Sequence, residues 1–188
     1  GDLDMAVNWE SAPIVGTSVS WGDVDGDADL DLAVGGERSP EGGVVLVYLN
    51  SGAVLSTTIA WEESLDSDVA DVAWGDMDGD DDLDLAVGVN GNNLVLANQF
   101  VEEGRFAFTT GWRSDDDWLT SGVAWADVDL DGDLDLAAGN SIPPSEAMLG
   151  PNAVIYENSG WRLDEIPAWH SSFSAFTTGI DWGDVDND

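Results

Sequence analysis

A loop of alternating aspartates occurs three times in this chain of 188 residues. In the third copy, positions 1, 3, 5 and 9 of the loop are aspartates and position 6 is glycine: Asp127, Asp129, Asp131, Asp135 and Gly132. An oxygen at every second residue, closed by a sharp turn, is how a backbone surrounds a hard cation such as Ca²⁺. Four side chains, the carbonyl at position 7 and a water would supply the oxygens that Ca²⁺ prefers. The pattern therefore predicts a calcium loop.

The candidate ligands of the three complete loops are all aspartates: Asp23, Asp25, Asp27, Asp29 and Asp31; Asp76, Asp78, Asp80, Asp82 and Asp84; Asp127, Asp129, Asp131, Asp133 and Asp135. A fourth loop is divided between the two chain ends, with candidate ligands Asp184, Asp186, Asp188, Asp2 and Asp4. At position 6, Ala28 and Asp81 replace the glycine. Aspartate tolerates a left-handed backbone better than alanine does, so we expect the least regular geometry in the first loop.

The residues around the loops predict strands rather than the two helices of an EF-hand. The flanks are short and rich in Val, Ala and Trp, as in Val123-Ala124-Trp125. Further strands are expected at residues 30–35, 44–49, 56–61, 94–97, 106–112 and 162–169, and no helix is expected. The motif tryptophans recur about every 50 residues, which indicates a repeat array.

Four strands per repeat of this length match one blade of a β-propeller. The sequence thus predicts an all-β fold, a β-propeller of four-stranded antiparallel blades with the aspartate-rich calcium loops on one rim. The chain forms one repeat domain, 1–188, or a fragment of a larger propeller. Its expected units are 1–20, 21–73, 74–124, 125–181 and the start of another at 182–188. The first unit is either truncated or discontinuous, because a single residue separates Val7 from Trp9.

The loops, together with the segments 44–50 and 153–159, resemble FG-GAP/VCBS repeats, the calcium-binding blades of the propeller also seen in integrin α-subunit heads. The resemblance covers nearly the whole chain. It implies adhesion or recognition but names no ligand, since a fold does not determine a function.

The charge of the chain is extreme, with 39 acidic residues against four arginines and no lysine, a net charge of −35. More than half of the acidic residues lie in the loops. Without counter-ions such loops repel themselves, so we expect metal binding and folding to be coupled. Nucleic acids and anionic membranes are poor partners for this surface. No apolar run reaches the roughly 20 residues of a membrane-spanning helix.

We expect an extracellular or cell-surface location. The chain has no cysteine, so calcium rather than disulfides would stabilise it. Loops of this kind bind weakly and need the millimolar Ca²⁺ found outside cells. The chain does not begin with methionine and starts within a motif, which indicates a piece of something longer.

A second set of tryptophans, Trp9, Trp61, Trp112 and Trp169, follows the same period as the motif set. This regularity favours packing between sheets over a sugar-stacking platform. Trp118 and Trp161 lie outside the pattern and are better candidates for an exposed contact.

The favoured function is a non-catalytic adhesion, recognition or assembly module. The ligand would be a protein, a carbohydrate or a neighbouring subunit, bound at the irregular turns 37–43 and 140–151. One alternative is the propeller domain of a polysaccharide-active enzyme, and another is a head-to-tail polymer whose subunits share a calcium loop. Catalysis is disfavoured because the chain has one histidine, His170, which we interpret as an ordinary strand residue.

Overall fold

The computed structural model describes residues 9–99, 106–141, 151–172 and 176–183. Within these ranges the regular structure is all β, in three four-stranded antiparallel sheets and one short hairpin. Within each sheet the strands lie side by side in chain order, so each sheet is a meander, and the short hairpin is inserted between the third and fourth strands of the first sheet. The predicted all-β fold of four-stranded antiparallel sheets is confirmed. In this part of the chain no helix is long and apolar enough to cross a bilayer.

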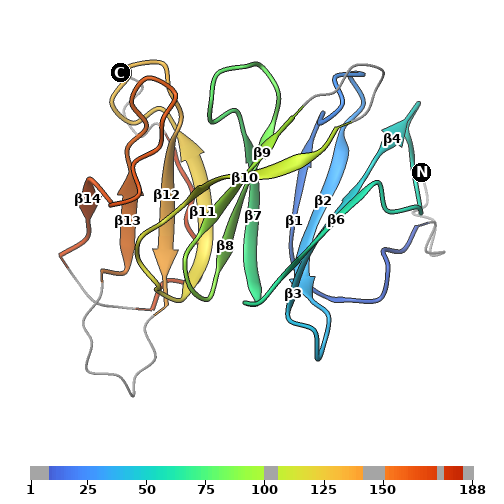
Figure 1. Cartoon of the computed structure of the whole chain (residues 1–188), viewed down its shortest axis with the longest axis horizontal. Helices are drawn as coiled ribbons and strands as arrows, with labels where there is room; N and C mark the ends of the chain where they lie inside the picture. The colour runs from blue at the N-terminus through green and yellow to red at the C-terminus, as the bar shows by residue number, and fades with distance from the viewer. Residues whose placement is uncertain (1–8, 100–105, 142–150, 173–175, 184–188) are drawn as a thin grey trace.

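The strands are placed as follows (Figure 1). The first sheet contains β1 (Val15–Gly22), β2 (Asp31–Glu37), β3 (Gly43–Tyr48) and β6 (Trp61–Leu65), and the short hairpin consists of β4 (Asn50–Ser51) and β5 (Val54–Leu55). The second sheet contains β7 (Val69–Gly75), β8 (Asp84–Val89), β9 (Leu94–Asn98) and β10 (Phe108–Arg113). The third sheet contains β11 (Thr120–Ala126), β12 (Asp135–Asn140), β13 (Ala153–Tyr156) and β14 (Trp169–His170).

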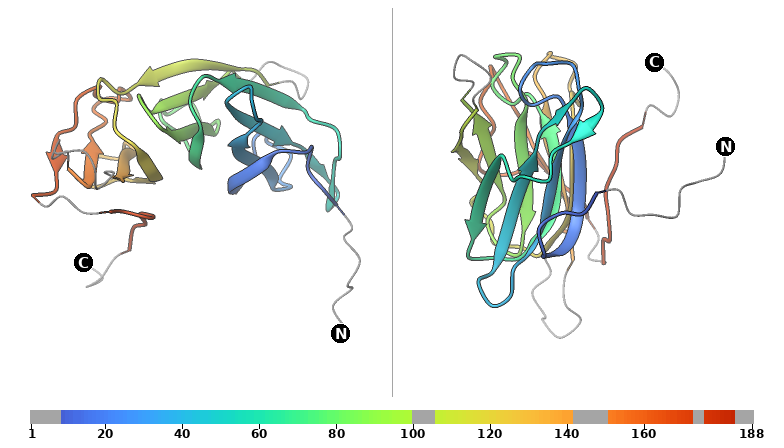
Figure 2. Two further views of the ribbon diagram at one scale, coloured as in Figure 1. Left: turned by 90° about the horizontal axis from the view of Figure 1, so that it is seen from below. Right: turned by 90° about the vertical axis from the view of Figure 1, so that its right-hand side faces the viewer.

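The three sheets stand face to face along an arc that does not close into a ring within the described residues (Figure 2, left). The first strands β1, β7 and β11 pack side by side. One core lies between the first and second sheets and includes Val45 and Leu85, and another lies between the second and third and includes Val95 and Leu136. Strands β3 and β9 are buried along their whole length, as expected for strands covered on both faces.

The motif tryptophans connect each sheet to the one before it. The indole N–H of Trp74 donates to the carbonyl of Ser20 (3.2 Å), and that of Trp125 donates to the carbonyl of Ala73 (3.1 Å). Glycine leaves room for the ring, because a Cβ on Gly75 would lie 2.6 Å from Cδ1 of Trp125. The interpretation as packing residues is confirmed for Trp74 and Trp125, whereas Trp21 of the first sheet is 53% exposed.

The second tryptophan set also packs between sheets. Trp61 of the first sheet contacts Phe108 of the second, with ring centroids 4.7 Å apart. Trp112 of the second sheet contacts Tyr156 of the third, with centroids 4.9 Å apart. The other two members differ: Trp9 packs on Tyr48 of the first sheet alone, and Trp169 is 51% exposed.

Several sequence expectations need correction. The fourth strand of the first sheet begins at Trp61 instead of covering residues 56–61, because the β4–β5 hairpin first turns the chain back. The strand expected at 162–169 shortens to Trp169–His170, because Asn158 and Leu163 close a turn before it. Trp118 packs against the core between the second and third sheets rather than forming an exposed contact.

The expected repeat units begin at the motif tryptophans, but each sheet begins several residues earlier. Strands β1, β7 and β11 all start before the tryptophan that they contain. The part of the Val7–Trp9 connection that precedes Trp9, and most of the turn at 140–151, lie outside the described residues. The other irregular turn, at 37–43, is held by an ion pair between Arg38 and Glu62 (2.5 Å).

Asp71 on β7 connects all three sheets. One carboxylate oxygen accepts a hydrogen bond from the Ser18 hydroxyl of β1, and the other accepts one from the backbone N–H of Val123 on β11 (2.9 Å). The Val123 N–H is part-buried, so losing its acceptor leaves a donor without a partner.

We therefore expect Asp71→Ala to lower the free energy of unfolding by about 1–3 kcal/mol, the usual cost of an unsatisfied buried group. Urea denaturation in excess calcium measures it. The control is Asp66→Ala, which removes an exposed aspartate of the loop between β6 and β7. Equal effects of the two substitutions would contradict the bridging role of Asp71.

Candidate metal centre

Each aspartate-rich loop joins the first strand of a sheet to its second strand. The carboxylate at position 1 shapes the loop by accepting backbone N–H groups from the turn. Asp23 accepts from Asp27 (3.0 Å) and Ala28 (2.9 Å), and Asp127 accepts from Asp131 and Gly132 (3.1 Å each). Aspartate side chains that bond to backbone a few residues ahead favour turns, so the sequence itself drives this local shape.

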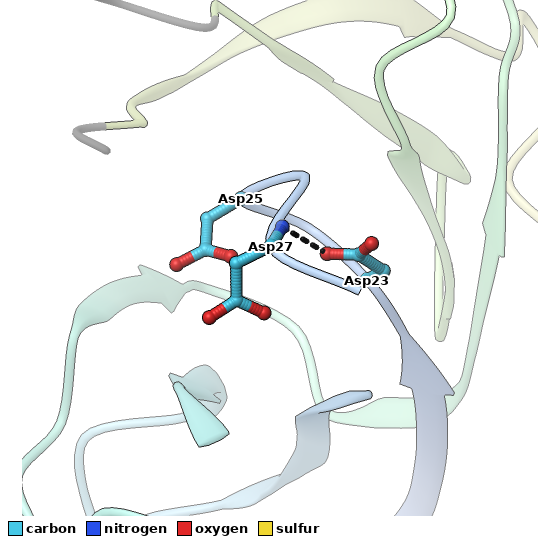
Figure 3. Close-up of side chains that lie close together, drawn as sticks. All are labelled: Asp23, Asp25 and Asp27. Atoms are coloured by element: carbon cyan, nitrogen blue, oxygen red, sulfur yellow. Dashed lines mark hydrogen bonds between the residues drawn. The ribbon is translucent and has the colours of Figure 1, made fainter. Parts of the chain in front are cut away.

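In all three loops, three carboxylates come together with ligand atoms within 4.8 Å of one another. The groups are Asp23, Asp25 and Asp27; Asp76, Asp78 and Asp84; and Asp127, Asp129 and Asp135. Figure 3 shows the first group, in which the side chains of Asp25 and Asp27 lie beside Asp23 on one turn of the loop. Clustered carboxylate oxygens suit a hard divalent cation such as Ca²⁺.

Two of the aspartates at position 3 carry the strongest indication of a cation site. Oδ1 of Asp25 and Oδ1 of Asp78 are buried and have no hydrogen-bond partner. A buried carboxylate oxygen without a donor is costly, whereas a metal ion would satisfy it. The residues present therefore fit a bound cation.

The aspartate at position 9 is the most buried member of each loop: Asp31 is 0% exposed, Asp84 0% and Asp135 1%. One oxygen of Asp84 accepts the N–H of Met77 in its own loop (2.8 Å), and the other accepts the N–H of Asn98 at the end of β9 (2.7 Å). The same pair of bonds is made by Asp31 and by Asp135. Position 9 thus fastens the loop to the sheet.

The aspartates at position 7 behave differently from the other predicted ligands. The side chain of Asp29 accepts the N–H of Gly52, and that of Asp133 accepts the N–H of Trp161 (3.0 Å), so both are directed to the hairpin that follows the third strand. None of the three carboxylate groups includes Asp29, Asp82 or Asp133. A backbone carbonyl at this position remains the predicted ligand.

Two further outcomes concern the predicted ligands. At position 5, Asp27 belongs to its group, while Asp80 and Asp131 do not. The five residues of the divided loop, Asp184, Asp186, Asp188, Asp2 and Asp4, lie outside the described part of the chain.

The loop backbone turns left-handed at two positions. At position 6, φ is 72° for Ala28, 71° for Asp81 and 101° for Gly132. The first loop therefore makes the same turn at position 6 as the second. Its carboxylate group still differs from the other two, because it includes Asp27 and not Asp31. Position 4 is also left-handed, with Gly26 and Gly79 in two loops and Leu130 (φ 64°) in the third, a requirement that the sequence reasoning missed.

Burial and like charge disfavour the ionised aspartates when no cation is present. Burial raises the pKa of Asp84 to about 7, against the opposing effect of its hydrogen bonds from Asn98 and Met77. Burial, and then repulsion from Asp80 and Asp76, raises the pKa of Asp78. A bound cation would reverse these shifts by stabilising the charged form.

The sequence reasoning also missed an asparagine that lies at, or two residues beyond, the end of the third strand of each sheet. The Nδ2 group of Asn98 donates to the carbonyl of Val24 (3.2 Å), and that of Asn158 donates to the carbonyl of Met77 (2.8 Å). Each bond reaches the aspartate-rich loop of the preceding sheet. The signal was available as the recurring asparagine two residues after Tyr48, Leu96 and Tyr156.

The left-handed backbone at position 4 yields a prediction. Leu130→Gly should raise the free energy of unfolding by roughly 0.5–1 kcal/mol, because relief of the left-handed strain exceeds the entropy cost of glycine. Leu130 is 83% exposed, so little packing is lost. Thermal denaturation in excess calcium measures the change. Val128→Gly in the same loop is the control and should destabilise; a loss of stability in both variants would contradict the strain argument.

Comparison with known proteins agrees with this geometry. Residues 76–138 match the family model described as FG-GAP-like repeat. This range contains the second and third aspartate-rich loops complete and the strands between them. No curated protein sequence matches the chain. The chain therefore carries an FG-GAP-like repeat.

Proposed function

We propose that the chain is a calcium-stabilised β-propeller-type module that acts outside the cell as a non-catalytic adhesion or recognition unit. The observation that carries the proposal is the threefold recurrence of the carboxylate group, each with its ligand atoms within 4.8 Å. In this proposal the three sheets are blades, and the aspartate-rich loops hold one Ca²⁺ each.

The donor set favours calcium over softer metals. Every candidate ligand is a carboxylate, and the chain has no cysteine and one histidine. Oxygen-only donors suit Ca²⁺, Mg²⁺ or Mn²⁺, while zinc and copper sites favour nitrogen and sulfur. A flexible loop with many carboxylates favours Ca²⁺ over Mg²⁺, because Mg²⁺ demands compact octahedral geometry and releases its waters reluctantly.

The titratable groups support a role other than catalysis. A general acid or base working near neutral pH needs a shifted pKa and access to a substrate. Outside the loops, the described carboxyl with a raised pKa is Asp116, and burial is the main cause. Its oxygens already accept hydrogen bonds from the hydroxyls of Tyr156 and Ser114, so it is committed to the core.

Calcium binding is tested by substitution at position 3. Asp78→Asn keeps the shape of the side chain but removes its charge, so the affinity of one site should fall at least about tenfold while the other sites are unchanged. Isothermal titration calorimetry measures affinity and stoichiometry. Asp68→Asn, which alters an exposed aspartate outside the loops, is the control. The proposal fails if the parent chain takes up no Ca²⁺.

The pH dependence of stability should invert between the metal-free and the calcium-loaded protein. The pKa of Asp84 is about 7 in the folded chain and near 4 when unfolded, so the folded state binds the extra proton. In the metal-free protein, the contribution of this protonation to the free energy of unfolding is then full below about pH 4 and is lost as the pH rises through 7. Calcium needs the ionised form, so it should raise the melting temperature more at pH 7.5 than at pH 5. Identical calcium effects at both pH values would be the contrary result.

A further inference from the structure

A cleft of about 490 Å³ lies between the second and third sheets, beside the second aspartate-rich loop. Its lining comes from both sheets and includes Arg113 and Asp115 of the second, and Trp161, Arg162 and Glu165 of the third. Sites for small ligands have volumes of roughly 300–1,000 Å³ and combine an aromatic wall with a few polar groups. The cleft thus has the size and composition of a binding site.

The arginines of this cleft are unusual for so acidic a chain. The chain has four arginines and no lysine. Arg38 is paired with Glu62, and Arg105 lies outside the described residues. The remaining two, Arg113 and Arg162, both line the cleft, are exposed, and form no ion pair within the described ranges. Unpaired guanidinium groups in a recess are suited to a carboxylate, which they bind with two parallel hydrogen bonds.

Trp161 occupies a backbone position that disfavours it. Gly160 (φ 64°) and Trp161 (φ 63°) are both left-handed, and the turn is closed by a hydrogen bond from Ser159 N–H to the Arg162 carbonyl. A non-glycine residue held in this conformation costs free energy and points to a role for its side chain. The equivalent turn of the first sheet has Gly52 and Ala53 with the same φ signs, followed by Val54. The fold therefore needs neither the indole nor the arginine here.

The two aspartate-rich loops position Trp161. Its backbone N–H donates to Asp133 in the third loop (3.0 Å), and its ring lies on Gly79 of the second loop, where a Cβ would come within 2.4 Å of Cδ2. The side chain nevertheless stays 46% exposed. One part of the indole is thus fixed against a loop while the rest is open, as a stacking surface requires.

We propose that this cleft binds an acidic saccharide, a sugar ring that carries a carboxylate. The indole of Trp161 stacks on the apolar face of the ring, Arg113 and Arg162 bind the carboxylate, and Asp115 and Glu165 accept hydrogen bonds from hydroxyl groups. A neutral sugar would leave both guanidinium groups unused, and a small anion would leave the indole unused. This inference rests on the proposed recognition function and names its ligand class.

The test is calorimetric titration of the whole chain, in excess calcium, with oligogalacturonates, alginate oligosaccharides and glucuronate-containing oligosaccharides. At least one should bind, and its methyl ester should bind about tenfold more weakly or worse. Two single variants, Trp161→Ala and Arg162→Val, each introduce the residue that stands at the equivalent position of the first sheet, Ala53 or Val54, so each should fold. Each should weaken binding about tenfold. Arg38→Val, with the same loss of charge on a distant surface, should bind like the parent.

The outcomes separate this inference from the proposed function, because calcium binding is measured in its own titration. If calcium binds but no uronate oligosaccharide does, the saccharide inference is overturned and the calcium module stands. Equal affinity for acid and ester, or unchanged affinity in both cleft variants, also overturns it. Should Trp161→Ala lose its calcium stoichiometry, Arg162→Val decides, since that side chain makes no hydrogen bond or ion pair in the described structure.

Discussion

The buried carboxylate at position 9 of each aspartate-rich loop is the contact on which the architecture depends. Asp31, Asp84 and Asp135 are almost fully buried, and both oxygens of each accept backbone N–H groups. One donor lies in the loop, and the other lies at the end of the third strand or two residues beyond it, so a single side chain holds the loop against the sheet. Charged acceptors form stronger hydrogen bonds than neutral ones, which offsets part of the cost of burial.

The asparagines extend this contact from one sheet to the next. The backbone N–H of Asn98 donates to Asp84, and its side chain donates to the carbonyl of Val24 in the loop of the preceding sheet. Asn158 forms the same two bonds, to Asp135 and to the carbonyl of Met77. A loop is therefore coupled to its own sheet and to the following one. Repeat proteins derive stability from such nearest-neighbour interfaces, so a cation bound in one loop would also stabilise the junction with the neighbouring sheet.

The aspartate-rich loops could be predicted from the sequence, whereas the contacts between sheets could not. The spacing of the aspartates located the loops, and their carboxylates do converge, because that convergence depends on residues within one turn. The three-sheet bridge made by Asp71 and the cross-sheet bonds of Asn98 and Asn158 involve partners more than 50 residues away. The left-handed backbone at Leu130 was hidden because leucine gives no signal for it, whereas Gly26 and Gly79 do.

Exposure in a repeat array depends on the neighbour as much as on the residue. Val19, Val72 and Val123 occupy equivalent places in the first strands of their sheets. Each is paired with the fourth residue of the second strand: Val34, Val87 and Ala138. Val72 and Val123 are 4% exposed because a preceding sheet covers them, while Val19 is 60% exposed. Identical side chains thus form core in two sheets and surface in the first. Sequence pattern identifies which face is apolar, and only the arrangement of sheets determines whether that face is covered.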